Sequence, residues 1–320
     1  MALQVFGFYN GLDENAKGYR YFLQYGSQLD YIALFQISIL PNGELSGEPS
    51  RRLIQEAHRR GIKVLIVISN LTRQGSFSSP LLSRLTHDQG FAYRVLQNIR
   101  TMLRSYQADG VNFDLEKALP EDRIPFANLL ESWTNQLRSE NYLVMLDVPA
   151  QIKDEPTDEW KGAFHYPTLG RINFNGIVLM TYEEHWPGSD PGSVASLPWD
   201  ERVVDYALAS GIPAWKLFLG IPLYGYDWTA RGKAQVIGRE RAIQVARRYG
   251  APIQWDEDQH SAYFRYTSEG QNHTVYFEEL RSLREKINLA RRRDLGGIAL
   301  WEMNLSYPDL WTNLQSYLNP

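Results

Sequence analysis

Residues 109–116 read DGVNFDLE, a stretch in which polar and apolar side chains alternate. Successive side chains of a β-strand point to opposite faces. Asn112, Asp114 and Glu116 therefore share one face of a predicted strand, and the apolar residues between them share the other. If the apolar face packs in a core, the polar face must line a site or meet solvent.

Short apolar runs of this kind recur along the 320-residue chain, separated by amphipathic patterns such as residues 89–106. Several runs are apolar almost throughout, which is typical of strands buried on both faces of a parallel sheet. The alternation of the two patterns predicts a parallel sheet with crossover helices. We count eight predicted strands, at residues 3–9, 31–39, 63–69, 110–116, 143–149, 176–182, 216–223 and 297–302.

Eight such units, with no G-x-G-x-x-G after the first strand, favour a closed (β/α)8 TIM barrel of the α/β class over a doubly wound sheet. The gap between the last two strands is far longer than one helix requires. We predict that it holds a small α+β insertion, which would wall one side of the barrel mouth. Its predicted parts are a helix at 236–249 and strands at 253–256, 263–266 and 274–277. We expect one domain over residues 1–320, with the barrel at 1–225 and 281–320 and the insertion at about 226–280.

The overall composition excludes several classes of partner. A net charge of -4 without a basic stripe argues against nucleic acid. No stretch reaches the roughly 18 to 20 apolar residues of a membrane span, so we expect no membrane partner. The absence of cysteine excludes disulfides and thiolate metal sites. The first residues lack a signal-peptide pattern, so we expect that the protein acts where it is made or that an export signal has been removed.

The polar face of residues 109–116 predicts chemistry. Active sites of barrels gather at the carboxyl ends of the strands, and alternate strand residues point inward. Asp114 and Glu116 would then lie about 6 to 7 Å apart along the backbone, from the rise per residue of a strand. At this distance one pKa is pushed up and the other down. A neutral acid beside an ionised carboxylate can protonate a leaving group while stabilising positive charge.

A metal site is the alternative for this polar face. Asn112, Asp114 and Glu116 carry oxygens that suit Mg²⁺ or Ca²⁺. We find no matching carboxylate cluster at the end of a neighbouring strand, and six scattered histidines show no metal-binding spacing. We therefore expect neither a metal nor a cofactor.

DGVNFDLE resembles the D-x-x-D-x-D-x-E signature of glycoside hydrolase family 18, the chitinase-like (β/α)8 enzymes. Three more segments, in the right order, resemble that family's sixth, seventh and eighth strands: MTYEEHW at 180–186, GIPLYGYDW at 220–228 and GGIALWEMN at 296–304. The resemblance covers nearly the whole chain. The insertion and the loop after Tyr182 look most like the branch of bacterial spore-germination and cortex-lytic glucosaminidases.

The resemblance implies substrate-assisted retention of configuration. Glu116 would protonate the glycosidic oxygen and later activate water, while the substrate's own 2-acetamido carbonyl attacks C1. Asp114 would accept the acetamido N–H and offset the developing positive charge. Tyr182 would donate its hydroxyl to the acetamido carbonyl, and Trp301 would form the floor under the sugar.

Two positions depart from the common family pattern. Asn112 stands where many members have a second Asp, and Glu183 stands where Asp usually follows the tyrosine. An amide cannot share a proton as a carboxyl pair does, so the departure at Asn112 affects charge shuttling and not the acid. Together with Met180, which opens the same segment, Glu183 is expected to bind substrate.

Residues at other strand ends are candidates for sugar contacts. Tyr9, Asn70 and Tyr224 each follow or end a predicted strand, and each serves equally well as a packing residue of the barrel rim. Trp186 lies in a loop rich in proline and glycine, which predicts exposure and stacking on a sugar.

The resemblance implies an enzyme that cleaves β-1,4 bonds after N-acetylglucosamine, and we expect its substrate to be peptidoglycan of the spore cortex. The alternatives are a chitinase, an endo-N-acetylglucosaminidase on other glycans, and a chitinase-like lectin that binds glycans without cleaving them. Such lectins usually lose the acid, whereas this chain keeps Glu116. We expect a monomer that binds an N-acetylglucosamine polysaccharide, in the spore coat or cortex or outside a bacterial cell.

Overall fold

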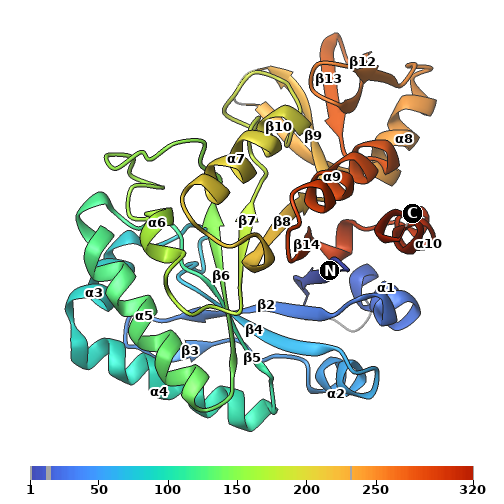
Figure 1. Cartoon of the computed structure of the whole chain (residues 1–320). Coiled ribbons are helices and arrows are strands. Elements are labelled where there is room, and N and C mark those ends of the chain that lie inside the picture. The colour runs from blue at the N-terminus through green and yellow to red at the C-terminus, as the bar shows by residue number, and fades with distance from the viewer. Residues whose placement is uncertain (1, 12–15, 231–232, 320) are drawn as a thin grey trace.

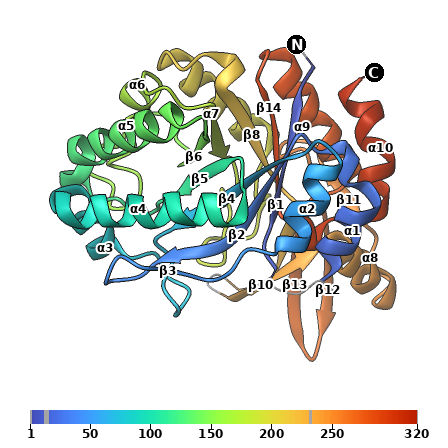
Figure 2. The same cartoon turned by 90° about the horizontal axis from the view of Figure 1, so that it is seen from below.

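The computed structural model describes residues 2–11, 16–230 and 233–319. Within these residues, eight parallel strands run in the order β1-β14-β8-β7-β6-β5-β4-β2, and the pairing of β1 with β2 closes the ring. A short strand, β3, adds to β2 in antiparallel orientation. Helices surround the strands in two nearly perpendicular views (Figures 1 and 2). The predicted (β/α)8 barrel is confirmed.

The barrel strands match the predicted runs to within two residues. They are β1 Gln4–Tyr9, β2 Tyr31–Ile39, β4 Lys63–Ser69, β5 Gly110–Asp114, β6 Leu143–Pro149, β7 Gly176–Met180, β8 Leu217–Pro222 and β14 Gly297–Trp301, with β3 at Leu45–Ser46. The helices of the barrel are α1 Lys17–Tyr25, α2 Arg51–Arg59, α3 Ser79–His87, α4 Gln89–Tyr106, α5 Arg123–Ser139, α6 Tyr166–Leu169, α7 Leu197–Ala209, α9 Leu280–Arg292 and α10 Pro308–Leu318. Short 3-10 helices lie at Gly26–Gln28, Pro120–Asp122, Ala214–Lys216 and Met303–Leu305.

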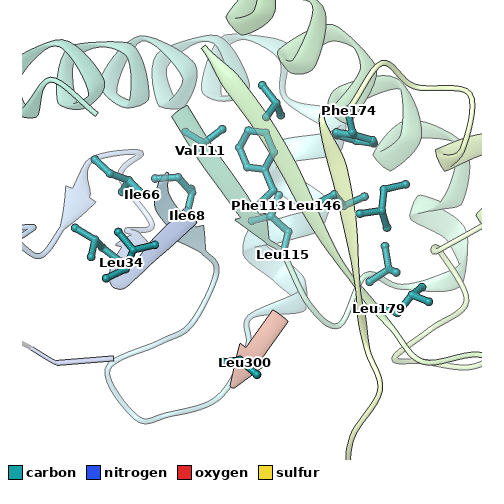
Figure 3. Packing of buried hydrophobic residues seen from close by; sticks show 14 of the residues in the cluster. Leu34, Ile66, Ile68, Val111, Phe113, Leu115, Leu146, Phe174, Leu179 and Leu300 are labelled. Carbon is teal, nitrogen blue, oxygen red and sulfur yellow. The ribbon is translucent and has the colours of Figure 1, made fainter. Parts of the chain in front are cut away.

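The outward face of β5 is the apolar one. Val111, Phe113 and Leu115 are fully buried in the layer between strands and helices, with Leu146 of β6 among their neighbours (Figure 3). Removing side chains of this size from water contributes about 1.5 to 3 kcal/mol each. This burial fixes the register of β5, because a slip by one residue would turn the polar face into the same apolar layer.

A second, smaller apolar cluster fills the lower part of the barrel interior. It consists of Phe6, Phe8, Ala33, Leu65, Val67, Met145, Val178, Phe218 and Ala299. Every barrel strand except β5 contributes at least one of these side chains. The polar residues of β5 therefore rest on a packed floor and not on an open channel, as expected of a TIM barrel.

Residues 224–277 form a second, antiparallel sheet between β8 and α9. Its strands are β9 Tyr224–Ala230, β10 Lys233–Gly238, β11 Gln254–Asp256, β12 Ser261–Ser268 and β13 Gln271–Phe277, in the order β10-β9-β13-β12-β11, and α8 spans Arg239–Arg248. It lies above one side of the barrel in Figure 1.

The sequence reading of this segment missed β9 and β10. We assigned residues 236–238 to a helix because Val236 and Ile237 continue the apolar pattern of α8, but they pair with β9 instead. Gly238 ends that strand and precedes the first helical residue, Arg239. The run GYDW, which ends the segment that resembles the family's seventh strand, belongs to β9.

Candidate active site

The inward residues of β5 build a polar layer above the apolar floor. Asn112 pairs in register with Val67 and Met145, both of which belong to the interior cluster. Two residues further along their strands lie Asp114 on β5 and Asp147 on β6, so these carboxyls occupy the next layer toward the mouth. Both Asp side chains are only 4% exposed, which makes an ionised state costly.

Glu116 lies just beyond β5, and a buried asparagine holds its backbone. The side chain of Asn70 accepts from the backbone N–H of Glu116 (2.9 Å) and donates to its carbonyl oxygen (2.8 Å) and to that of Ser78 (3.2 Å). Asn70 is fully buried. Glu116 is the second residue after β5 and would otherwise be free to adopt many conformations, so this clamp aims its carboxyl into the barrel mouth.

The three carboxyls of the site perturb one another. Burial raises the pKa of Glu116 well above its usual range, and the nearby charges of Asp114 and Asp147 add to this effect. Burial also raises the pKa of Asp114, to about 7, although a hydrogen bond with Glu116 opposes the increase. The direction of these effects places the proton on Glu116, which donates to Asp114. An acid beside an acceptor is the arrangement that general acid catalysis requires.

Tyr182 and Trp301 face each other across the mouth. Their rings stack with centroids 6.4 Å apart and planes 21° apart. Phe8 and Phe35 pack edge-on against Trp301, with centroids at 5.4 and 5.2 Å, so the indole is fixed from below. Burial and the neighbouring carboxyls raise the pKa of Tyr182 well above its usual range, which keeps its hydroxyl a hydrogen-bond donor.

These groups line a cavity of about 840 Å³ at the carboxyl ends of the strands. Its volume falls within the range of small-molecule and oligosaccharide sites. Aromatic rings dominate its upper wall. The lining includes the predicted residues Asp114, Glu116, Met180, Tyr182, Glu183, Trp186, Tyr224 and Trp301, together with Asn10, Phe35, Leu71, Phe77, Asp147, Pro149, Ala150, Asp158, Trp160, Lys161 and Trp199.

Two phenols hold the Glu183 side chain at the edge of the cavity. Tyr224 and Tyr226, both from β9, donate their hydroxyls to its carboxylate, the latter at 2.9 and 3.0 Å. Burial of the carboxylate end raises the pKa of Glu183, and the two phenolic hydrogen bonds oppose the increase. The extra methylene of Glu183 therefore reaches toward β9, where the second sheet meets the barrel mouth.

Trp186 is 53% exposed and stands on the cavity wall as predicted from its loop. A turn fixes its backbone, because Trp186 donates to the Ser189 hydroxyl (3.0 Å) and accepts from the Ser189 backbone N–H (2.9 Å). Gly188 permits this turn. A Cβ atom there would lie 2.2 Å from the indole ring, so only glycine allows the ring to fold back over the loop.

Trp160 is a member of the site that the sequence analysis missed. Its indole N–H donates to the Glu116 carboxyl (3.1 Å), which lowers the pKa of that acid against the larger effects of burial and charge. The side chain of Asp158 accepts from the backbone N–H groups of Trp160 and Lys161, and Phe77 packs edge-on against the indole. This loop carries no regular pattern that would have placed it over the barrel mouth.

Two candidate sugar contacts lie away from the cavity, in packing positions. Tyr9 is 1% exposed and belongs to the outer apolar layer, because Phe6 and Phe8 take the inward positions of β1; Asn10 reaches the cavity instead. Asn70 is buried behind Glu116 and does not line the cavity. Asn112 also lies below the cavity surface, where its amide donates to Asp147 (2.5 Å).

Two further features bear on the expected partners. Among residues 2–11, 16–230 and 233–319, no group of three or more His, Asp or Glu side chains is arranged to hold a metal ion. In the same part of the chain, no helix is long and apolar enough to cross a bilayer.

A TIM barrel with paired carboxyls and an aromatic-walled cavity at the carboxyl ends of its strands defines the glycoside hydrolase class of site. Residues 6–305 match the family described as Glycosyl hydrolases family 18, and the chain belongs to that family. It is a glycosidase. The family acts on glycans that contain N-acetylglucosamine.

Individual relatives resemble the chain over most of its length. A cortical fragment-lytic enzyme of Bacillus subtilis is 31% identical over 297 residues, which cover 91% of this chain and 68% of that protein. A chitinase structure from Chromobacterium violaceum has a TM-score of 0.92 at 25% identity and covers all of both chains. The spore cortex-lytic enzyme SleL of Bacillus cereus has a TM-score of 0.91 at 26% identity, over 98% of this chain and 74% of that one.

Proposed function

We propose that the protein cleaves β-1,4 bonds after N-acetylglucosamine in peptidoglycan of the bacterial spore cortex, by substrate-assisted catalysis with retention. The observation that carries the chemistry is that Asp114 and Glu116 line one cavity together with Tyr182 and lie close enough to perturb each other's pKa. The choice of polymer rests on the likeness to the cortical fragment-lytic enzyme and to SleL.

In the first half of the reaction, Glu116 gives its proton to the glycosidic oxygen as the bond to C1 breaks. The acetamido carbonyl oxygen of the same sugar attacks C1 from the opposite face and forms a positively charged oxazolinium ring. Asp114 accepts a hydrogen bond from the acetamido N–H, and its negative charge stabilises the ring in the dry site. Tyr182 donates to the attacking carbonyl oxygen and orients it.

In the second half, water attacks C1 and gives a proton to Glu116, which has become a base. The ring opens and the acetamido group is restored. Two inversions at C1 yield net retention. The separation of Asp114 and Glu116 does not predict this outcome, because the nucleophile comes from the substrate. Trp301 would support the sugar from below, and Met180, Glu183, Tyr224 and Trp186 would contact it from the walls.

The test compares the wild-type protein with Glu116→Gln on purified cortex fragments, chitin oligomers and high-mannose glycans. Mass spectrometry should find new reducing-end N-acetylglucosamine from cortex with the wild type only, while the variant still binds the fragments. Release from chitin oligomers but not from cortex would favour a chitinase, which the likeness to the Chromobacterium structure supports. Binding without turnover by either protein would indicate a lectin, and a fully active variant would refute Glu116 as the acid.

A further inference from the structure

Asp147 is a buried carboxyl that none of the family-like segments contains. It lies on the inward face of β6, is 4% exposed and borders the cavity. Its Oδ2 atom accepts from the Asn112 amide at 2.5 Å, and both side chains are buried. A buried carboxyl costs several kcal/mol unless it is neutral or paired, so its presence requires an explanation.

The contact with Asp147 fixes the orientation of the Asn112 amide. The amide nitrogen points toward Asp147, so the amide oxygen points toward the other side chains around it. That oxygen has no hydrogen-bond partner in the described part of the chain, and the same holds for Oδ1 of Asp114 and Oδ1 of Asp147. Three unpaired acceptors in two adjoining buried layers cannot all face one another without a proton or a ligand between them.

The groups that face Asp147 come from two other strands. Asp114 and Glu116 project from β5 and its end, and the Tyr182 phenol projects from the end of β7. Where they are ionised, Asp114 and Asp147 favour the protonated form of Glu116. Burial and the charge of Asp114 also raise the pKa of Asp147 itself well above its usual range. The Tyr182 hydroxyl stays neutral in the same field. Every electrostatic effect of Asp147 therefore acts on a group that the proposed reaction uses.

We propose that Asp147 is a positioning residue of the reaction, which orients the Asn112 amide from β6 beneath the Asp114–Glu116 pair. The inference rests on the proposed function. It also accounts for Asn112, since an amide and a carboxyl on adjacent strands form one hydrogen-bonded pair where two carboxyls would repel each other. Asp147 needs no contact with the substrate to act in this way.

The test uses Asp147→Asn, which keeps an oxygen that accepts from Asn112 and removes only the ionisable group. Removing its charge should lower the pKa of Glu116, so the alkaline limb of kcat/KM moves to lower pH. At the wild-type optimum, kcat/KM should fall about tenfold or more, as for a misplaced or mis-protonated acid. The substrates are cortex fragments and a chitin oligomer, and melting curves confirm the fold.

The exchange variant Asn112→Asp with Asp147→Asn provides the rescue. It restores one amide and one carboxyl in contact, and should return kcat/KM to within about threefold of the wild type if the two positions act as a pair. Asp122→Asn is the matched control, because Asp122 is also fully buried and accepts from Ser83 and Thr86, but does not line the cavity. It should leave the pH profile unchanged.

The outcomes separate this inference from the proposed function. If the wild type releases no product from either substrate, the proposed function fails. If the wild type is active and Asp147→Asn keeps its kcat/KM and its alkaline limb, Asp147 has no part in the reaction. If Asp147→Asn does not fold, the exchange variant decides: a folded, inactive exchange variant overturns the inference, and an active one supports it.

Discussion

Asn70→Ala removes the clamp on the backbone of Glu116, and its effects can be estimated from the contacts. The substitution deletes the partners of one buried N–H and one carbonyl group of Glu116, as well as a bond to Ser78. A buried polar group without a partner costs about 1 to 3 kcal/mol, so the two groups of Glu116 together predict a loss of roughly 2 to 6 kcal/mol in the free energy of unfolding. Typical domains are stable by about 5 to 15 kcal/mol, so the variant should still fold.

The effect of Asn70→Ala on activity should exceed its effect on the fold. Without the clamp, the Glu116 carboxyl is free to move, and a displacement of about 1 Å in a catalytic group costs on the order of 100-fold in rate. Denaturant unfolding and kcat on cortex fragments measure the two effects. Asn98→Ala is the control, since Asn98 is partly exposed, makes one bond to the Gly43 carbonyl and should cost less than about 1 kcal/mol. If Asn70→Ala keeps the kcat and the stability of the wild type, Asn70 does not hold the Glu116 backbone in the way we infer.

Three further substitutions test individual contacts of the site. Trp160→Phe removes a hydrogen bond that lowers the pKa of Glu116, so the alkaline limb of kcat/KM should move to higher pH. Tyr182→Phe should lower kcat by about 100-fold, as for the loss of one donor to a developing charge, with little change in melting temperature. Gly188→Ala should displace the Trp186 ring and raise KM for long oligosaccharides while kcat on a short substrate is kept.

Each of these predictions has a result that contradicts it. An alkaline limb that stays in place in Trp160→Phe would mean that the indole contact does not form in solution. Full activity of Tyr182→Phe would exclude the hydroxyl from the reaction. Gly90→Ala is the control for Gly188→Ala, because its added Cβ meets nothing closer than 3.5 Å. Equal KM values in Gly188→Ala and Gly90→Ala would show that Trp186 does not contribute to substrate binding.

The alternation of polar and apolar side chains in residues 109–116 was sufficient to predict that the polar face of β5 points into the barrel. The structure buries Val111 and Phe113 in the outer layer and places Asn112 and Asp114 in the interior. The same rule places Tyr9 on the outer face of its strand, because Phe6 and Phe8 point inward. The strand that carries Tyr9 was predicted correctly, but the Tyr9 side chain lies on its outer face and not in the barrel mouth.

Asp147 carried a comparable signal. A single carboxyl in the apolar run LVMLDVP is as unusual as the one in GVNFD, and the two strands are neighbours. A lone carboxyl does not form a metal-binding cluster, so Asp147 is not among the predicted site residues. Trp160 differs, because its position depends on a loop whose path is set by Asp158 and Phe77 and by no periodic pattern.

Residues outside the family signature set the proton affinity of the acid. Glu116 receives opposing effects from two neighbours: the charge of Asp147 raises its pKa, and the indole of Trp160 lowers it. An acid catalyses only below its pKa, so the alkaline limb must move down when Asp147 loses its charge and up when Trp160 loses its donor. The family signature contains neither Asp147 nor Trp160, so it identifies the acid but not the pH at which the acid works. That pH depends on a residue of β6 and on a residue of the loop that follows β6. The two single variants measure this division directly, because their shifts have opposite signs and no general loss of stability produces such a pair.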